Sequence, residues 1–205
     1  MMAQDLKKEL KTLYNPSTKE VSIVDVPAMN FIMVDGSGDP NGSPQLEQAI
    51  EALYSVAYAA KFKLKRADPT LDYAVMPLEG LWWLANGAKY NPNAPRDNWR
   101  WTLMIMQPDA VTAETVGEAI EEVRKKKNPA ALEGLRFERY EEGQAAQIMH
   151  LGPYAAEGPT IARLHDSIEQ SGYHLCGKHH EIYLSDRRRT APEKLRTILR
   201  QPVEP

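Results

Sequence analysis

Apolar residues follow two different spacings along this chain, and the spacing changes several times. Apolar residues three or four positions apart predict amphipathic helices, and they occur at residues 5–14, 43–57, 112–127 and 159–171. Short alternating or unbroken apolar runs, which are typical of strands, lie between these helices. They occur at residues 20–26, 30–34, 72–84, 99–107, 136–140, 145–150 and 177–186. The order of these segments predicts a mixed α+β fold.

Local signals refine several of these elements. Ser43 is a typical N-cap with Pro44 at the first helical position, and Thr112 caps the next long helix. Pro77 and Gly80 interrupt the run at residues 72–84, so we expect a bulge or kink near Glu79 rather than a regular central strand.

Two further local signals concern the second half of the chain. The strands at 136–140 and 145–150 are separated by Glu141-Glu142-Gly143, which predicts a hairpin. Thr190 and Glu193 have the spacing of a capping box, which predicts a last helix that ends at Pro202. Its apolar side would consist of Leu195, Ile198 and Leu199.

The order of elements repeats in the two halves of the chain. Ile32–Gly36 and Ile148–Gly152 lie 116 residues apart (148 − 32), and each is followed by a Gly/Pro loop and an amphipathic helix. Each half then has a later strand with a carboxylate, Glu79 in the first and Glu181 in the second. We expect a tandem strand-helix-strand-strand repeat that forms one antiparallel sheet, with helices on one face and a central cleft. Glu79 and Glu181 would approach this cleft from opposite sides.

The repeat also sets the expected domain organisation. Residues 1–19 would form an N-terminal helical extension, and residues 20–205 would form one domain. Its two repeats would span about 20–107 and 108–205.

Composition excludes several classes of protein. The chain has 205 residues, 42% hydrophobic and 26% charged, which suffices for a packed core. A net charge of −3 argues against a nucleic-acid-binding domain. The single cysteine cannot form an intrachain disulfide, and no apolar run is long enough for a membrane span or a signal peptide. We therefore expect a cytoplasmic protein without membrane or nucleic-acid partners.

The strand at 177–186 carries the strongest candidate for chemistry. Side chains alternate along a strand, so His179, Glu181 and Tyr183 share one face, while His180 and Ile182 share the other. A carboxylate among apolar neighbours is costly unless it has a partner or serves a pocket. Glu181 is either a paired structural group or the functional group of a pocket, and burial would raise its pKa toward the range of a general base.

Aromatic residues suggest what such a pocket would bind. Trp82, Trp83, Trp99 and Trp101 offer faces for planar molecules and cations, although each is equally suited to a core. Consecutive residues of a strand point to opposite faces, so only one of Trp82 and Trp83 can line the cleft. Tyr154 and Tyr183 offer hydroxyls to a ligand carbonyl.

The histidines do not match a zinc motif. His179 and Glu181 share a strand face, but they provide only two ligands, and the spacing of the histidines fits neither common zinc pattern. We therefore predict no metal and no cofactor, and we assign His150 and His179 to hydrogen bonding near the ligand.

Three strings of residues resemble the GyrI-like small-molecule-binding family, which has the fold of the effector-binding domains of multidrug-responsive transcription activators. They are Met-Pro-Leu-Glu-Gly-Leu-Trp-Trp at Met76–Trp83, Ile-Met-His-Leu-Gly-Pro-Tyr at Ile148–Tyr154, and Lys-His-His-Glu-Ile-Tyr-Leu-Ser-Asp at Lys178–Asp186. The resemblance implies an aromatic pocket with a buried glutamate, which maps onto Glu181. Some stand-alone members resemble hydrolases that open strained cyclopropane rings. Only about 20 residues precede the repeat, too few for a helix-turn-helix unit.

These observations lead to one main hypothesis with open alternatives. We predict a small-molecule-binding protein for flat, hydrophobic or cationic compounds, in which Glu181 activates water and Tyr154 polarises a ligand carbonyl. The expected ligand-binding residues are Glu79, Trp82, Trp83, Trp101, His150, His179 and Tyr183. Binding without turnover needs the same residues. A protein partner, as for gyrase modulators, would instead contact Arg187–Arg189 or the acidic helix at Glu118–Glu122.

Overall fold

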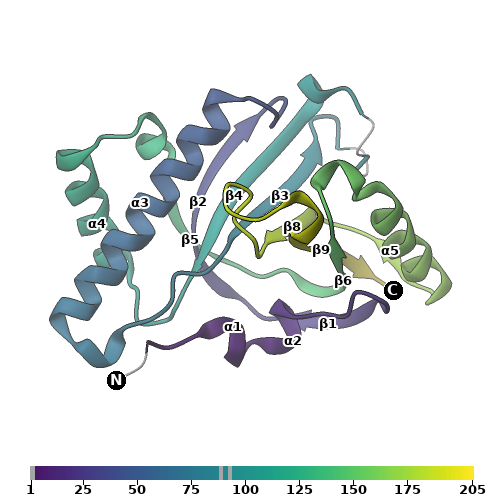
Figure 1. Cartoon of the computed structure of the whole chain (residues 1–205), viewed down its shortest axis with the longest axis horizontal. Helices are drawn as coiled ribbons and strands as arrows, with labels where there is room; N and C mark the ends of the chain where they lie inside the picture. The colour runs from purple at the N-terminus through teal and green to yellow at the C-terminus, as the bar shows by residue number, and fades with distance from the viewer. Residues whose placement is uncertain (1–2, 88–89, 92–93) are drawn as a thin grey trace.

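The computed structural model describes residues 3–87, 90–91 and 94–205. Within these residues, an antiparallel sheet of nine strands forms the centre of the molecule, with the strand order β1-β6-β9-β8-β3-β4-β2-β5 and with β7 paired to β9 (Figure 1). The predicted α+β class is therefore confirmed.

The strands are β1 (Ser22–Val26), β2 (Met29–Ser37), β3 (Leu78–Leu84), β4 (Trp99–Gln107), β5 (Arg136–Tyr140), β6 (Gly143–Leu151), β7 (His174–Leu175), β8 (His179–Tyr183) and β9 (Arg196–Glu204). The helices of the described residues are α1 (Leu6–Glu9), α2 (Lys11–Tyr14), α3 (Pro44–Ala67), α4 (Ala113–Lys126) and α5 (Gly158–Gln170). The N-caps act as predicted, because the side chains of Ser43 and Thr112 accept hydrogen bonds from the first turns of α3 and α4. None of the helices in the described residues is both long and apolar enough to cross a bilayer.

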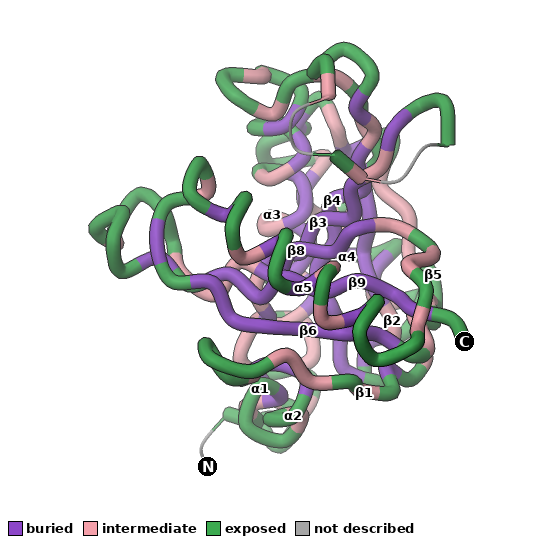
Figure 2. Tube along the Cα trace, turned by 90° about the vertical axis from the view of Figure 1, so that its right-hand side faces the viewer, coloured by how far each residue is buried: buried purple, intermediate pink, exposed green. Residues whose placement is uncertain are grey.

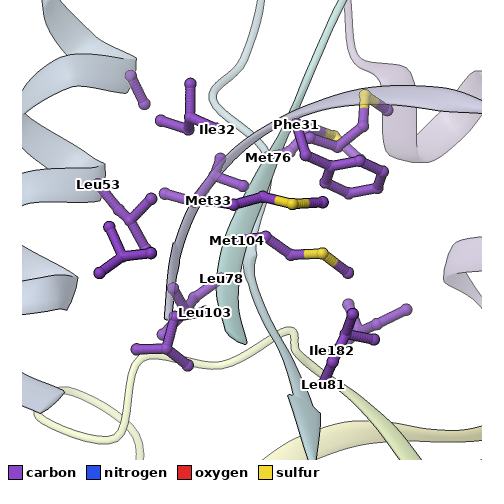
Figure 3. Close-up of a cluster of buried hydrophobic side chains, with 14 of the residues drawn as sticks. Phe31, Ile32, Met33, Leu53, Met76, Leu78, Leu81, Leu103, Met104 and Ile182 are labelled. Carbon is purple, nitrogen blue, oxygen red and sulfur yellow. The ribbon is translucent and has the colours of Figure 1, made fainter. Parts of the chain in front are cut away.

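The two long amphipathic helices of the repeat cover the same face of the sheet. Figure 1 shows α3 and α5 on either side of the central strands, with α4 outside α3. Leu53 of α3 lies over Ile32, Leu78 and Leu103 of the sheet (Figure 3). Helix α5 buries Ile161, Leu164 and Ile168 in a second apolar cluster, together with residues of β6 and β9. The sheet face between the two helices is left for a cavity.

The two halves of the molecule are joined by antiparallel pairing between β1–β2 of the first half and β5–β6 of the second half. Ser22 pairs with Gln147 in the β1–β6 ladder, and Met29 pairs with Tyr140 in the β2–β5 ladder. From Ser22 to Met29 the chain advances seven residues, and from Gln147 to Tyr140 it goes back seven. The two ladders therefore share one register, which is interrupted at Pro27 and at Glu142. The predicted hairpin between 136–140 and 145–150 is therefore wrong. Each of these strands pairs with the first half of the chain instead of with the other.

The predicted C-terminal helix is also wrong. Residues Arg196–Glu204 form β9, which lies between β6 and β8. Seven consecutive residues of this strand are buried, so its apolar residues show no simple alternation. The predicted capping box contributes only a single 3₁₀ turn at Pro192–Lys194.

Strand β3 is regular, contrary to the expected kink near Glu79. It pairs without interruption with β4 from Leu78 to Leu84 and with β8 from Leu78 to Trp82. Pro77 lies just before the strand and therefore needs no place in the ladder. Figure 2 shows that β3, β8 and β9 are buried along most of their length.

The far face of the sheet holds a buried network of charged and polar groups. His180 places Nε2 2.9 Å from Oε2 of Glu79 and Nδ1 2.9 Å from Oε1 of Glu142. Arg200 donates to Oε2 of Glu142 at 3.1 Å. Burial alone would lower the pKa of His180, but Glu142 and then Glu79 outweigh it and raise this pKa to about 9. The network therefore holds a charged imidazolium.

The N-terminal helices cover this network. The hydroxyl of Tyr14 donates to Oε1 of Glu79 at 2.8 Å. Arg200 donates to the carbonyl of Leu13 at 2.7 Å, and the Gln147 amide donates to the carbonyl of Thr12 at 2.7 Å. These bonds attach α2 to the far face and satisfy groups that would be costly to bury without partners.

Candidate functional site

A cavity of about 740 Å³ lies between α3 and α5, above the central strands. Its apolar side is formed by Leu46 and Ile50 of α3, by Ile161 of α5 and by aromatic residues of the sheet and loops. The polar groups that reach it include Glu157, Glu181 and Arg96. A largely apolar cavity with a few convergent polar groups is typical of a small-molecule site. The aromatic residues that line it are Trp82, Tyr90, Trp99, Tyr154 and Tyr183.

Glu181 is held by hydrogen bonds from aromatic side chains. The indole N–H of Trp82 donates to the hydroxyl of Tyr183 at 3.1 Å, and that hydroxyl donates to Oε2 of Glu181 at 2.9 Å. Tyr90 makes a further side-chain hydrogen bond to Glu181. Only 8% of the surface of Glu181 is exposed, so the carboxylate has a fixed orientation and little contact with water.

Gly80 creates the space for this arrangement. It pairs directly with Glu181 across the β3–β8 ladder. A Cβ atom at this position would lie 2.8 Å from Nε1 of Trp82 and 3.1 Å from the Tyr183 hydroxyl. Gly80, which suggested a kink in the sequence, therefore lies in a regular strand and leaves room for the side chains of Trp82 and Tyr183 to pack closely over it.

The cavity contains two carboxyl groups with raised pKa values. Burial raises the pKa of Glu181 to about 7, although the hydrogen bond from Tyr183 and the charge of His180 oppose this effect. Burial and then the charge of Glu181 raise the pKa of Glu157 to about 9. Near pH 7, Glu157 is therefore protonated, while Glu181 exchanges readily between its acid and its carboxylate. Two carboxyl groups with separated pKa values can act as an acid and a base in one site.

Part of the cavity wall consists of aromatic rings that contact one another edge to face. The ring of Trp99 lies 5.7 Å from that of Trp82 and 5.6 Å from that of Tyr90. The guanidinium of Arg96 lies 4.3 Å from the centre of the Trp99 ring. These rings offer a site of stacking and edge contacts for a flat molecule.

Glu79 does not lie in this cavity, and the expectation that it shares a cleft with Glu181 is wrong. It pairs with Ile182 rather than with Glu181, and its side chain points to the far face. There it bonds to Tyr14 and His180. The prediction failed because β3 is regular. In a regular strand Glu79 and Gly80 point to opposite faces of the sheet, whereas a kink would have allowed the Glu79 side chain to turn toward the cavity.

Trp82 and Trp83 separate as the alternation of a strand requires. Trp82 lines the cavity, whereas Trp83 lies on the far face under the ammonium group of Lys178, 3.7 Å from the ring centre. Trp101 is fully buried against Gly36 and does not line the cavity. Of these three predicted tryptophans, the structure brings only Trp82 to the site.

Tyr154 and Tyr183 both line the cavity, and their rings meet edge to face at 5.6 Å. His150 lies outside the cavity lining and is hydrogen-bonded through Nδ1 to the Thr160 hydroxyl at 3.0 Å. His179 is buried beside Glu181. The structure therefore places the predicted catalytic residues Glu181 and Tyr154 together, with Trp82 and Tyr183 beside them, while their roles stay predictions.

Sequence reasoning missed several residues of the cavity, above all Tyr90, Glu157 and His165. Glu157 follows the conspicuous Gly152-Pro153-Tyr154 turn by three residues, and His165 lies on the predicted apolar side of its helix. Both signals could have drawn attention to them. Tyr90 lies in a polar loop without any periodicity, so no sequence pattern marked it.

The described residues contain no group of three or more histidine, cysteine or acidic side chains arranged to hold a metal ion. His180 and its two glutamates are instead engaged with one another and with Arg200.

The fold and the cavity together define a small-molecule-binding domain. The family model of the GyrI-like small molecule binding domain matches residues 19–204. The chain belongs to this family. No functionally curated protein matches the sequence.

Solved structures agree with this assignment. An uncharacterized conserved protein from Listeria innocua is 42% identical over 98% of this chain and 100% of that chain, with a TM-score of 0.89. A hydrolase from Listeria innocua is 41% identical over 98% of this chain and 100% of that chain, with a TM-score of 0.84. The C-terminal domain of EcmrR is 12% identical over 90% of this chain and 97% of that chain, with a TM-score of 0.55, a likeness of fold alone.

Proposed function

We propose that this protein is a hydrolase that binds a flat, hydrophobic, electrophilic small molecule in the aromatic cavity and adds water to it. The observation that carries the proposal is the pair Glu181 and Glu157, two buried carboxyl groups with different pKa values beside one aromatic cavity. A solved hydrolase with 41% identity over nearly the whole chain supports the same class of reaction.

The proposed substrate carries a strained ring conjugated to a carbonyl, as in cyclopropane-bearing genotoxic compounds. The rings of Trp82 and Trp99 provide contacts for a planar, conjugated skeleton. A cationic compound would gain further from the carboxylate of Glu181. The site therefore favours flat compounds that are neutral or positively charged over anions.

In the proposed reaction, the carboxylate of Glu181 removes a proton from a water molecule. The water oxygen forms a bond to a carbon of the strained ring, and one carbon–carbon bond of that ring breaks. The released electron pair moves through the conjugated system to the carbonyl oxygen, which takes a proton from the carboxylic acid of Glu157. Glu181 then holds one proton more and Glu157 one proton less, and transfer through solvent restores both.

The remaining polar groups position these two. Tyr183 and Tyr90 fix the direction of the Glu181 lone pairs, because both donate to this carboxylate. Tyr154 lies beside Tyr183, and burial and then the charge of Glu157 raise its pKa to about 12. Its hydroxyl therefore keeps its proton and can donate to a ligand carbonyl.

The test is a titration followed by tryptophan fluorescence, with flat hydrophobic cations and neutral cyclopropane-bearing indoles, and with product analysis for every compound that binds. We expect a ring-opened product that contains one oxygen from water, traced with ¹⁸O-labelled water. Glu181→Gln should keep binding of neutral compounds and lose at least a hundredfold in turnover, the low end of a general base contribution of about 10²–10⁴.

Neighbouring tryptophans provide the matched control. Trp82→Phe changes the cavity wall, whereas Trp83→Phe changes a half-buried indole on the far face. Only the Trp82 variant should weaken ligand binding. Binding without any conversion would refute the hydrolase and leave a sequestering or sensing protein, and equal effects of the two tryptophan variants would refute this cavity as the binding site.

A further inference from the structure

The imidazole of His179 is buried and poorly hydrogen-bonded. This residue is 1% exposed, and among the described residues neither Nδ1 nor Nε2 makes a hydrogen bond of good geometry. The side chain of Gln201 is a weak hydrogen-bond partner that favours the charged form of the ring. Buried polar atoms without good partners are rare in folded proteins because each one loses its bond to water. A poorly paired histidine directly beside a candidate catalytic carboxylate calls for a functional explanation.

The surroundings of His179 fix the position of its ring. The ring of Tyr90 stacks on the imidazole with 4.2 Å between the ring centres and an angle of 10° between the planes. Tyr90 also bonds to Glu181. Nε2 of His179 lies 3.7 Å from Oε1 of Glu181, while Oε2 accepts the hydrogen bond from Tyr183. The carboxylate oxygen that does not accept from Tyr183 therefore faces the imidazole.

Burial keeps the ring of His179 neutral. Burial lowers its pKa to about 3, and His165 and His180 lower it in the same direction, whereas Gln201 and Glu142 oppose them. A neutral imidazole has one nitrogen that accepts a hydrogen bond. An ionised Glu181 cannot donate to this nitrogen, but a protonated Glu181 can, once the distance shortens by about 0.8 Å to the usual hydrogen-bond length.

We propose that His179 is a positioning residue whose neutral Nε2 accepts a hydrogen bond from Oε1 of Glu181 whenever Glu181 is protonated. The bond is absent from the carboxylate form and present in the acid form. His179 therefore stabilises Glu181 in the state that follows removal of a proton from water, and it directs that proton away from the cavity. Only the catalytic use of this hydrogen bond rests on the proposed function. The hydrogen bond itself forms in the protein without ligand.

The experiment measures the pKa of Glu181 in the protein without ligand. The carbonyl band of its protonated carboxyl group is followed by infrared difference spectroscopy between pH 4 and 9, and it is assigned by its loss in Glu181→Gln. His179→Phe keeps an aromatic ring against Tyr90 but removes the acceptor, so the protonated form of Glu181 loses its bond. We expect the pKa of Glu181 to fall by roughly half to one pH unit. His179→Gln restores an acceptor and should return the pKa toward the wild-type value.

A second measurement needs no substitution at His179. In protein labelled with ¹⁵N-histidine, the Nε2 resonance of His179 should move with the same midpoint as the Glu181 band, and it should not move in Glu181→Gln. This readout also settles the case in which His179→Phe does not fold. A pKa of Glu181 that is the same in folded His179→Phe and wild type, or an Nε2 resonance that ignores the titration of Glu181, would overturn the proposal. Neither readout depends on turnover, so failure of this proposal can be distinguished from failure of the hydrolase proposal.

Discussion

Replacement of Glu181 by glutamine should make the protein more stable at alkaline pH. The pKa of Glu181 is about 7 in the folded protein, against 4.5 for an ordinary glutamate. A carboxyl group whose pKa is raised on folding favours the folded state only as the acid, so its ionisation costs stability as the pH rises from about 4.5 to about 7. Glutamine is neutral at every pH and still accepts the hydrogen bond from Tyr183.

The size of the effect follows from the two pKa values. The difference between about 7 and 4.5 corresponds to roughly 3 kcal/mol, at about 1.4 kcal/mol per pKa unit. Part of it is shared with Glu157, whose own pKa depends on the charge of Glu181. We therefore expect Glu181→Gln to raise the free energy of unfolding by roughly 2–3 kcal/mol at pH 8 and by nearly nothing at pH 4.5.

The assay is urea denaturation followed by tryptophan fluorescence at pH 4.5, 6 and 8. Glu142→Gln provides the opposite case on the far face. Burial alone would raise the pKa of Glu142, but His180 and then Arg200 lower it to about 2. Its ionised form therefore stabilises the protein above about pH 4.5, and this stabilisation is lost as the pH falls toward 2. Glu142→Gln should cost roughly 3–5 kcal/mol at pH 6, because it leaves charged partners buried.

The reasoning would be refuted if Glu181→Gln changed the unfolding free energy by the same amount at pH 4.5 and pH 8. It would also be refuted if the variant were less stable than wild type at pH 8. A gain in stability from loss of a candidate catalytic group is the expected cost of function at such a site.

Two further substitutions test the packing on the two faces of the sheet. Gly80→Ala would bring a Cβ within 2.8 Å of the Trp82 indole nitrogen and 3.1 Å of the Tyr183 hydroxyl, so we expect a loss of roughly 1–3 kcal/mol and weaker ligand binding; unchanged urea midpoint and fluorescence titration would contradict this packing. Tyr14→Phe removes the donor to Oε1 of Glu79 and should cost roughly 1–3 kcal/mol; a thermal midpoint equal to that of wild type would show that α2 does not depend on this bond.

The repeat predicted the fold better than the local signals did. The second strand-helix-strand-strand unit required a strand near the C-terminus, but the capping pattern of Thr190 and Glu193 favoured a helix there. The structure has β9 in that place. Its residues are buried on both faces, and it pairs with β6 and β8, strands that lie elsewhere in the sequence. Local periodicity does not record such long-range contacts.

The candidate site was predictable where one strand determined it. Alternation along β8 placed Glu181 and Tyr183 on one face and His180 on the other, as the structure has them. The partners of Glu79 and His180 could not be predicted, because they come from residues far apart in the sequence. Glu142 was predicted to lie in the turn of a hairpin, yet its side chain is 1% exposed and is paired with Arg200.

The sheet between the cavity and the far-face network is a single strand layer, and His180 and Glu181 are consecutive residues of it. Helix α2 therefore interacts electrostatically with the cavity through Glu79 and His180, although it lies on the far face of the sheet. An affinity tag or fusion partner that disturbs α2 would change the hydration of the His180 imidazolium, and with it the acidity of Glu181. Measurements on this protein should for this reason be compared with and without a tag at the N-terminal end.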